Sequence, residues 1–329
     1  MSIKLKNKKV LVAGAAGFIG TNLIRKLTDL GADITGTIHL NSPQHKFENV
    51  KYIKCDLTKQ EDCMKVTKEI DYVFMAAANS SGAEIIEKSP LIHLTPNVIM
   101  NTRMLEAAYA NRVKEFCFIS SNTVYPVSGK PMEETDTDGS YFSKYFVVGN
   151  MKKFSEQMCE MYSCYINNPM KTLVIRPGNL YGPFDKFGLK ESKVIASLVR
   201  KAVEGKFPLE VWGDGEEIKD FIYIDDFIDG LISVFESYES FDIYNIASGK
   251  QITVNEIARI IIQQIDPINK DIIHRSGMPS MIPKRLISIN KIVSRTSWKP
   301  STNLEIGLRR TIDWYSEIIK NSLATNADK

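Results

Sequence analysis

The sequence contains few of the residues from which a metal site or a disulfide framework is built. It has four histidines, which form no cluster, and five cysteines, an odd number with no C-x-x-C pair among them. Cysteines scattered in this way predict reduced, mostly buried thiols. No cysteine has a histidine partner at the spacing of metal ligands, so a metal site is not expected.

Long apolar runs and an excess of one charge are also missing. No run reaches the roughly 18 apolar residues of a membrane-spanning helix, and the basic N-terminus leads into a strand pattern rather than the apolar segment of a signal peptide. Lysine and arginine number 42 against 39 acidic residues, and the two signs are interspersed. We therefore expect a cytoplasmic protein that binds neither nucleic acid nor membrane.

What is present is enough apolar sequence for a large core, in alternating strand and helix patterns. The 329 residues are 43% hydrophobic, which predicts one large domain or two unequal ones. The alternation predicts an α/β fold with a doubly wound parallel sheet. We expect a dinucleotide-binding domain at 1–177, a smaller mixed α/β substrate lobe at 178–320 with some chain crossover between them, and a polar tail at 321–329. The predicted strands are Lys9–Ala13, Asp33–Ile38, Val50–Cys55, Tyr72–Ala76, Glu115–Ser120 and Thr172–Arg176, and the predicted helices are Gly20–Leu30, Gln60–Ile70, Pro96–Ala110, Ser143–Tyr162, Ser192–Glu204, Asp226–Glu236, Val254–Ile265 and Leu304–Ile319.

A glycine-rich turn follows the first predicted strand. Gly14, Gly17 and Gly20 are spaced G-x-x-G-x-x-G between that strand and a helix. In this context the first glycine permits a tight turn, the second lets phosphates approach the backbone, and the third lets the helix pack close to the sheet. A pyrophosphate then meets free N–H groups at the positive end of the helix. The turn predicts a bound dinucleotide.

The ends of the next two strands indicate which dinucleotide this is. An acid there suits the ribose of NAD and a cation the phosphate of NADP, but residues 35–42 contain neither Asp, Glu nor Arg. His39 is either a contact of a 2′-phosphate or an exposed loop residue. Since NADP is left without a firm cation, the sequence favours NAD slightly. Asp56, followed by Leu57, is placed to accept a bond from the adenine amino group, to cap the next helix, or to do both.

Eight ordered motifs extend this interpretation over almost the whole chain. They are Gly14-x-x-Gly17-Phe18-Ile19-Gly20, Asp56-Leu57, Ala76-Ala77-Ala78, Asn97-Val98 with Asn101-Thr102, Phe118-Ile119-Ser120-Ser121-Asn122-Thr123-Val124-Tyr125, Arg176-Pro177, Asn179-Leu180-Tyr181-Gly182-Pro183 and Asp220-Phe221-x-x-x-Asp225-Asp226. With them the chain resembles the extended short-chain dehydrogenase/reductases, the Rossmann-fold epimerase/dehydratase family that modifies nucleotide sugars. The stretches around Asn179, Lys193 and Trp212 look most like the GDP-fucose synthase branch, which favours a GDP-sugar.

The resemblance implies a serine, a tyrosine and a lysine as the catalytic residues. Ser121 matches the serine that polarises the sugar oxygen, and Lys152 matches the lysine that holds the nicotinamide ribose. The sequence departs from the family at Val148, which occupies the position of the proton-exchanging tyrosine and carries no proton to exchange. Tyr145, three residues earlier, is either a substitute proton donor or a packed aromatic; a water held by Ser121 and Lys152 is a third candidate. Lys152 and Glu156 also have the i,i+4 spacing of an exposed ion pair.

Other family reactions lack their residues. Asn122-Thr123 stands where dehydratases carry an acidic pair, and Thr123 and Phe184 stand where GDP-fucose synthase has the cysteine and histidine that epimerise C3 and C5. This leaves hydride transfer at one carbinol, which we expect to be C4, by an NAD(P)-dependent dehydrogenase or 4-keto reductase. Two alternatives stay open: a nucleotide-sugar 4-epimerase, and a catalytically silent protein that binds NAD and a nucleotide sugar.

The resemblance also implies the binding residues and the assembly. Two helices, Pro96–Ala110 and Ser143–Tyr162, pair in this family across a two-fold axis, so that a homodimer with a four-helix bundle is expected. The cofactor residues implied are Gly14, Gly17, Phe18, Ile19, Gly20, His39, Asp56, Leu57, Ala76, Ala77, Asn97 and Lys152, and those of the nucleotide-diphosphate sugar are Ser121, Asn179, Lys193, Val194, Trp212, Lys219 and Arg285.

Overall fold

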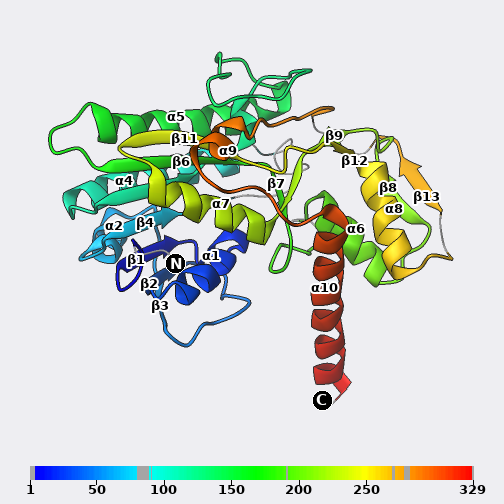
Figure 1. The fold of residues 1–329 in the computed structure, drawn as a ribbon. Helices are drawn as coiled ribbons and strands as arrows, with labels where there is room; N and C mark the ends of the chain where they lie inside the picture. The colour runs from blue at the N-terminus through cyan, green and yellow to red at the C-terminus, as the bar shows by residue number, and fades with distance from the viewer. Residues whose placement is uncertain are drawn as a thin grey trace.

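Seven parallel strands form the central sheet of the computed structural model, which describes residues 4–79, 89, 91–189, 192–268, 271–277 and 282–327 (Figure 1). Their order is β11-β6-β5-β4-β1-β2-β3. The chain order reverses between β1 and β4, and open sheets of this kind bind ligands beyond the carboxyl ends of the strands at such a point. The strands are β1 (Lys9–Ala13), β2 (Asp33–Ile38), β3 (Val50–Lys54), β4 (Tyr72–Met75), β5 (Glu115–Ile119), β6 (Lys171–Pro177) and β11 (Phe241–Ile246).

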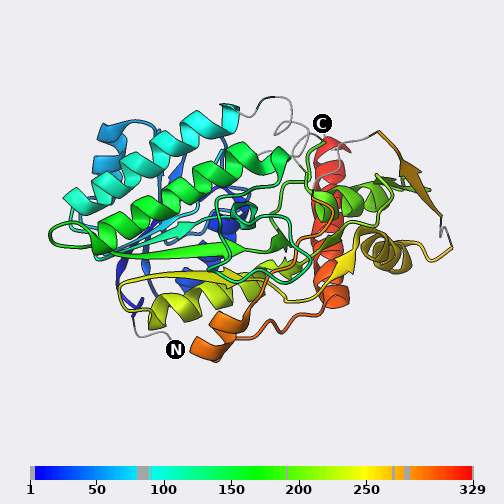
Figure 2. The same cartoon turned by 90° about the horizontal axis from the view of Figure 1, so that it is seen from above.

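Helices cover both faces of this sheet (Figure 2). One face carries α2 (Gln60–Thr67), α4 (Leu91–Ala110) and α5 (Phe146–Cys164), and the other carries α1 (Phe18–Asp29), α7 (Ile224–Ser237) and α9 (Asn290–Arg295). Because both faces are covered, the inner strands are rich in apolar residues, as in the fully buried β4. The predicted doubly wound parallel fold is confirmed, with the six predicted strands correct to within one residue at each end.

Helix α4 begins earlier than its sequence predicts. Pro96 was expected to open the helix, but it lies inside a helix that begins at Leu91. A proline inside a helix cannot donate to the carbonyl four residues before it, which here belongs to Ile92. That carbonyl accepts a hydrogen bond from Asn79 Nδ2 at 3.1 Å instead. A side chain from the loop after β4 thus replaces the missing backbone bond.

The rest of the second half of the chain forms a smaller lobe with helices α6 (Val194–Val203), α8 (Val254–Ile265) and α10 (Leu304–Ala327). In the part of the chain that the structure describes, three small two-stranded sheets accompany them: β7 (Asn179–Tyr181) with β10 (Phe221–Tyr223), β9 (Ile218–Lys219) with β12 (Ile252–Thr253), and β8 (Leu209–Trp212) with β13 (Ile272–Arg275). From the same half of the sequence, β11 joins the main sheet, and α7 and α9 cover one of its faces (Figure 1). Helix α10 continues to Ala327, so the segment from 321, expected to be a tail, begins as helix. Within the described residues, no helix combines the length and apolar character needed to span a membrane.

Candidate active site

The glycine turn is tightly packed between β1 and α1. Gly14 has φ of +85°, and a Cβ on it would lie 2.7 Å from the backbone of Ala77. A Cβ on Gly20 would lie 2.2 Å from the carbonyl oxygen of Gly14, whereas one on Gly17 would meet only that oxygen, at 3.2 Å. Gly14 and Gly20 are therefore required by the packing of the turn itself. Gly17 leaves the backbone open on the side from which a ligand would approach.

The N-terminus of α1 is free to bind an anion. Gly17 is the N-cap residue, no side chain of the described residues caps the helix, and the first turn contains no acid. The first N–H groups of a helix need acceptors, and the helix dipole favours a negative one. Phe18 and Ile19 lie in this turn. The turn thus fits the pyrophosphate of the predicted dinucleotide.

His39 and Asp56 lie close together at the ends of β2 and β3. Thr58 donates to Asp56 Oδ1 from its hydroxyl at 2.7 Å and from its backbone at 3.0 Å, and these bonds, with a smaller contribution from His39, lower the pKa of Asp56. The N-cap of α2 is Lys59, so capping by Asp56 is wrong. Asp56 instead closes a short turn with Thr58. His39 is exposed.

Asn97, expected to contact the cofactor, forms hydrogen bonds with the loop after β4 instead. It is 3% exposed, and its side chain accepts from Asn79 N at 2.8 Å and donates to Asn79 O at 2.9 Å and to His93 O at 2.6 Å. Ala76 and Ala77 begin this loop. Asn97 therefore positions the backbone that borders the glycine turn.

Ser121 follows the carboxyl end of β5, and Lys152 is bonded to that strand end from α5. Ser121 caps a short 3-10 helix, and its Oγ accepts from Thr123 N at 3.1 Å and from Thr123 Oγ1 at 3.0 Å. Lys152, on α5, donates from Nζ to Ile119 O, the last residue of β5, at 2.8 Å. Burial lowers the pKa of Lys152 to about 8, against an opposing effect of Glu156. The structure thus places both residues that the sequence singled out at the carboxyl end of β5.

Tyr145 and Val148 lie at the start of α5, where the family tyrosine is expected. Val148 is half-buried in the first turn. Tyr145 is the N-cap residue, and burial raises its pKa to about 12; the charged groups that act on it are Arg285 and Glu217. Those that act on Lys152 are Glu156 and Cys159. Tyr145 therefore belongs electrostatically to the neighbourhood of Arg285 and not to that of Lys152.

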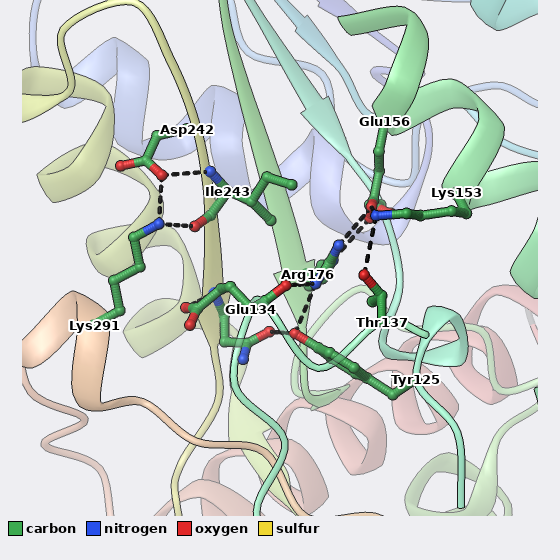
Figure 3. Close-up of polar contacts among 11 residues, drawn as sticks. Tyr125, Glu134, Thr137, Lys153, Glu156, Arg176, Asp242, Ile243 and Lys291 are labelled. Carbon is green, nitrogen blue, oxygen red and sulfur yellow. Dashed lines mark hydrogen bonds and ion pairs between the residues drawn. The ribbon is translucent and has the colours of Figure 1, made fainter. Parts of the chain in front are cut away.

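Glu156 is the centre of a buried polar network (Figure 3). It is 1% exposed and accepts two bonds from Arg176, at 2.9 and 2.6 Å, and one from Ser120 Oγ at 2.6 Å. Arg176 Nη1 donates to the hydroxyl of Tyr125 at 2.9 Å, which in turn donates to Asn245 Oδ1 at 2.7 Å. An exposed pair of Lys152 and Glu156 is therefore wrong. A charged residue inside an apolar strand pattern, as at Arg176, is the sequence signal from which a buried network could have been inferred. The sequence carries no comparable signal for Asn245.

Arg285 is a buried cation with unused donors. It is 3% exposed, and its Nη1 donates to Tyr125 O at 2.9 Å and to Pro126 O at 3.2 Å. Its Nε and Nη2 are buried and have no hydrogen-bond partner among the described residues, and burial lowers its pKa to about 10. Unpaired buried charges are costly, so this guanidinium fits an anionic ligand. Lys219, expected to act with it, is already paired with Glu217.

The other expected substrate residues lie on the smaller lobe. Asn179, on β7, donates from Nδ2 to Asp220 O at 2.8 Å. Lys193 is exposed at the N-cap of α6, with Val194 the first residue of that helix. Trp212 is 40% exposed on β8, and Lys201 Nζ lies 6.0 Å from its ring. Trp212 is therefore accessible to a stacking base.

Comparison with known proteins agrees with this architecture. The chain is 30% identical over 328 residues to a GDP-L-fucose synthase from Sinorhizobium fredii, covering 96% of this chain and 97% of that protein. It is 28% identical to a GDP-mannose 3,5-epimerase from Arabidopsis thaliana, covering 98% and 86%. A solved structure of an epimerase from Methanothermobacter thermautotrophicus matches with a TM-score of 0.85 at 29% identity, covering 96% and 94%. The solved structure of a UDP-glucose 4-epimerase from Thermotoga maritima shares the fold, with a TM-score of 0.85 at 24% identity. The match covers 94% of this chain and 99% of that one.

The family comparison covers most of the sheet and of the residues described above. A family model described as "NAD dependent epimerase/dehydratase family" matches residues 10–247, from β1 through β11. The matched segment includes the glycine turn, Ser121 and Lys152. The chain belongs to the NAD dependent epimerase/dehydratase family.

Proposed function

We propose that the protein transfers a hydride at C4 of a nucleotide-linked sugar, as a dehydrogenase or 4-keto reductase. The observation that carries the proposal is the placement of Ser121 and Lys152 at the carboxyl end of β5, where Lys152 Nζ donates to Ile119 O and Ser121 follows two residues later. Only β4 separates that end from β1 and the glycine turn. When bound, NAD(H) supplies or accepts the hydride.

The residues then have distinct roles. The oxygen of Ser121 accepts both bonds from Thr123, so its hydrogen is available to donate to the sugar oxygen. Lys152 binds the nicotinamide ribose, and the N-terminal turn of α1 binds the pyrophosphate. Asp56 accepts from the adenine amino group. We favour NAD over NADP because His39 is exposed and no arginine stands at the end of β2.

The nucleotide diphosphate binds to the smaller lobe. The two unused donors of Arg285 support this assignment, since a guanidinium suits phosphate oxygens. Asn179 contacts the sugar or its phosphate, and Lys193, Val194 and Trp212 flank the base. GDP is the proposed nucleotide, because the relatives at 30% and 28% identity act on GDP-sugars by name.

A 4-epimerase is the second candidate, because the same residues serve a hydride that returns to the opposite face of C4. Its support is the epimerase structure that matches at 29% identity. Epimerisation at C3 and C5 is not proposed. The hydroxyl of Thr123 is bonded to Ser121, and Phe184 packs 5.2 Å from the ring of Trp314 with no proton to exchange.

We also propose a cytoplasmic homodimer. Helices α4 and α5 lie side by side on the surface of the sheet layer (Figure 2). They expose Ile99, Phe154 and Met161, by 37, 45 and 50%, which a two-fold partner would bury in a four-helix bundle. Sedimentation of the Phe154→Glu variant tests this: we expect a monomer, and a wild-type protein that is itself monomeric would contradict the dimer.

An isotope experiment tests the reaction. The protein is incubated with oxidised cofactor and GDP-sugars that carry deuterium at C4, and the products are analysed by NMR. We expect a 4-keto product with the label on the cofactor. Label that returns to an inverted C4 would identify the 4-epimerase. Label that stays on unchanged substrate, together with activity gained by Val148→Tyr, would identify a silent binding protein.

A further inference from the structure

We propose that the amino ends of β4 and β5, together with the C-terminal end of α7, form a binding site for a primary ammonium group, and that the N-terminal segment fills this site with the side chain of Lys4. The strands are parallel, so the site lies at the opposite end of the sheet from Ser121 and the glycine turn. The inference therefore goes beyond the proposed function. It makes the segment before β1 a latch that closes this end of the sheet.

The ammonium of Lys4 has two close acceptors. Its Nζ donates to Glu115 Oε2 at 2.7 Å and to Phe235 O at 2.6 Å. Glu115 is the first residue of β5, its side chain is 7% exposed, and among the described residues Lys4 is the only cation paired with it. An unpaired buried charge is costly. The fold therefore requires a positive group beside this carboxylate.

The second acceptor lies at the end of a helix. Phe235 is in the last turn of α7, where the final four carbonyls have no N–H group of the helix to bond. The helix dipole places partial negative charge at this end, which favours a cation. The two acceptors thus select a group that has both a positive charge and N–H donors. A primary ammonium has both, whereas a quaternary ammonium has only the charge.

Three aromatic rings surround the ammonium. Nζ lies 4.4 Å from the centre of the Phe235 ring, 5.1 Å from that of Tyr238 and 5.9 Å from that of Tyr72. All three residues are buried, and the Phe235 ring lies 5.4 Å from Tyr72 and 6.1 Å from Tyr238. A cation within about 6 Å of a ring centre is attracted to the ring, more strongly where water is excluded. Because the rings pack on one another, this cage belongs to the sheet and α7 and not to the N-terminal segment.

The N-terminal segment is fixed next to the cage. Leu5 is 0% exposed and packs in the same core cluster as the three rings. The side chain of Lys4 is 22% exposed, and lysine is almost never buried without a partner. Lys6, two residues later, is exposed. One lysine of the segment is thus enclosed and its neighbour is left in solvent, which provides an internal control.

The first test is the reactivity of these two lysines in the wild-type protein. The amine of Lys4 must leave the cage before a limiting amount of acetic anhydride can acetylate it, so its rate reports on local opening. We expect peptide mass spectrometry to show Lys4 modified about tenfold more slowly than Lys6, and the two rates to become equal in urea. Equal rates in the folded protein would overturn the latch.

The second test is whether the emptied site accepts a free ammonium. We expect Lys4→Ala to unfold in calorimetry at a lower temperature than Lys6→Ala, the matched control. n-Butylammonium chloride, whose cation resembles the lysine side chain, should raise the unfolding temperature of Lys4→Ala in a saturable way, as a ligand of the folded state does. It should have this effect neither on wild type, whose site is filled, nor on Lys4→Ala combined with Glu115→Gln.

Other salts separate binding at the site from a general effect of ions. Tetramethylammonium chloride and sodium chloride at the same ionic strength should not reproduce the rise, because neither cation can donate to Glu115 or to Phe235 O. An equal rise with all three salts, or no rise with n-butylammonium, would overturn the ammonium site. If Lys4→Ala does not fold, the acetylation rates of the wild-type protein decide.

Discussion

Replacing Glu156 by Gln is expected to destabilise the protein more than any exposed charge substitution. In wild type, Nε and Nη2 of Arg176 both donate to Glu156. Glutamine keeps the shape of the side chain, but its NH₂ group would face one of these two donors and could not accept from it. Arg176 is 0% exposed. Although burial alone would lower its pKa, Glu156 raises it, so Arg176 stays charged. Removing one partner of a buried ion pair typically costs about 3–5 kcal/mol, a large part of the roughly 5–15 kcal/mol that stabilises a folded protein.

Urea unfolding followed by circular dichroism measures this cost. The matched control is Glu106→Gln on α4, which breaks a 3.3 Å pair with Arg103 between side chains that are 50 and 46% exposed. Exposed pairs contribute about 0–1 kcal/mol, so the control should differ little from wild type. If Glu156→Gln lost no more free energy of unfolding than Glu106→Gln, the network of Figure 3 would not be the stabilising centre that its geometry indicates.

Three further predictions concern the cofactor turn, the substrate cation and the lysine. Gly20→Ala places a Cβ 2.2 Å from the backbone of Gly14. Calorimetry should therefore show a loss of about 1–3 kcal/mol of stability and of most of the affinity for NAD. The control is Gly129→Ala, whose Cβ would have no atom within 4 Å and which should lose neither. Arg285→Met should weaken GDP binding at least tenfold in titration calorimetry and leave NAD binding unchanged; equal GDP affinity would refute its role. Because the pKa of Lys152 is lowered to about 8, the folded protein binds fewer protons than the unfolded chain above pH 8, so the stability of wild type relative to Lys152→Met should rise with pH up to the ordinary lysine value. A flat difference in urea unfolding would contradict this.

Much of the fold follows from the sequence because buried parallel strands are short apolar runs. Strand β11 was not predicted, and the reason lies in its polar residues: Asp242 pairs with Lys291, and Asn245 with Tyr125. Both partners come from distant parts of the chain. The polar residues of β11, which make it look unlike a buried strand in the sequence, therefore gain their partners only in the folded protein. The early start of α4 likewise depends on Asn79, outside the helix.

The site shows the same division. The glycine turn and the pair of Ser121 and Lys152 rest on local spacing, which the sequence displays. Helical spacing alone could not tell whether Glu156 faces solvent or the core. The link from Arg285 to Tyr125 spans 160 residues, and it can be recognised only when the smaller lobe is folded against the sheet.

The central claim, hydride transfer to or from a nucleotide sugar, is tested most directly by the absorbance of the reduced nicotinamide. Any cofactor bound to the purified protein is first released and identified. The protein is then supplied with NAD and mixed with GDP-, UDP- and dTDP-sugars in turn. We predict that the absorbance band of the reduced cofactor grows with a GDP-sugar and not in its absence. No bound cofactor, no affinity for added NAD and no change in the band with any of the sugars would contradict the account.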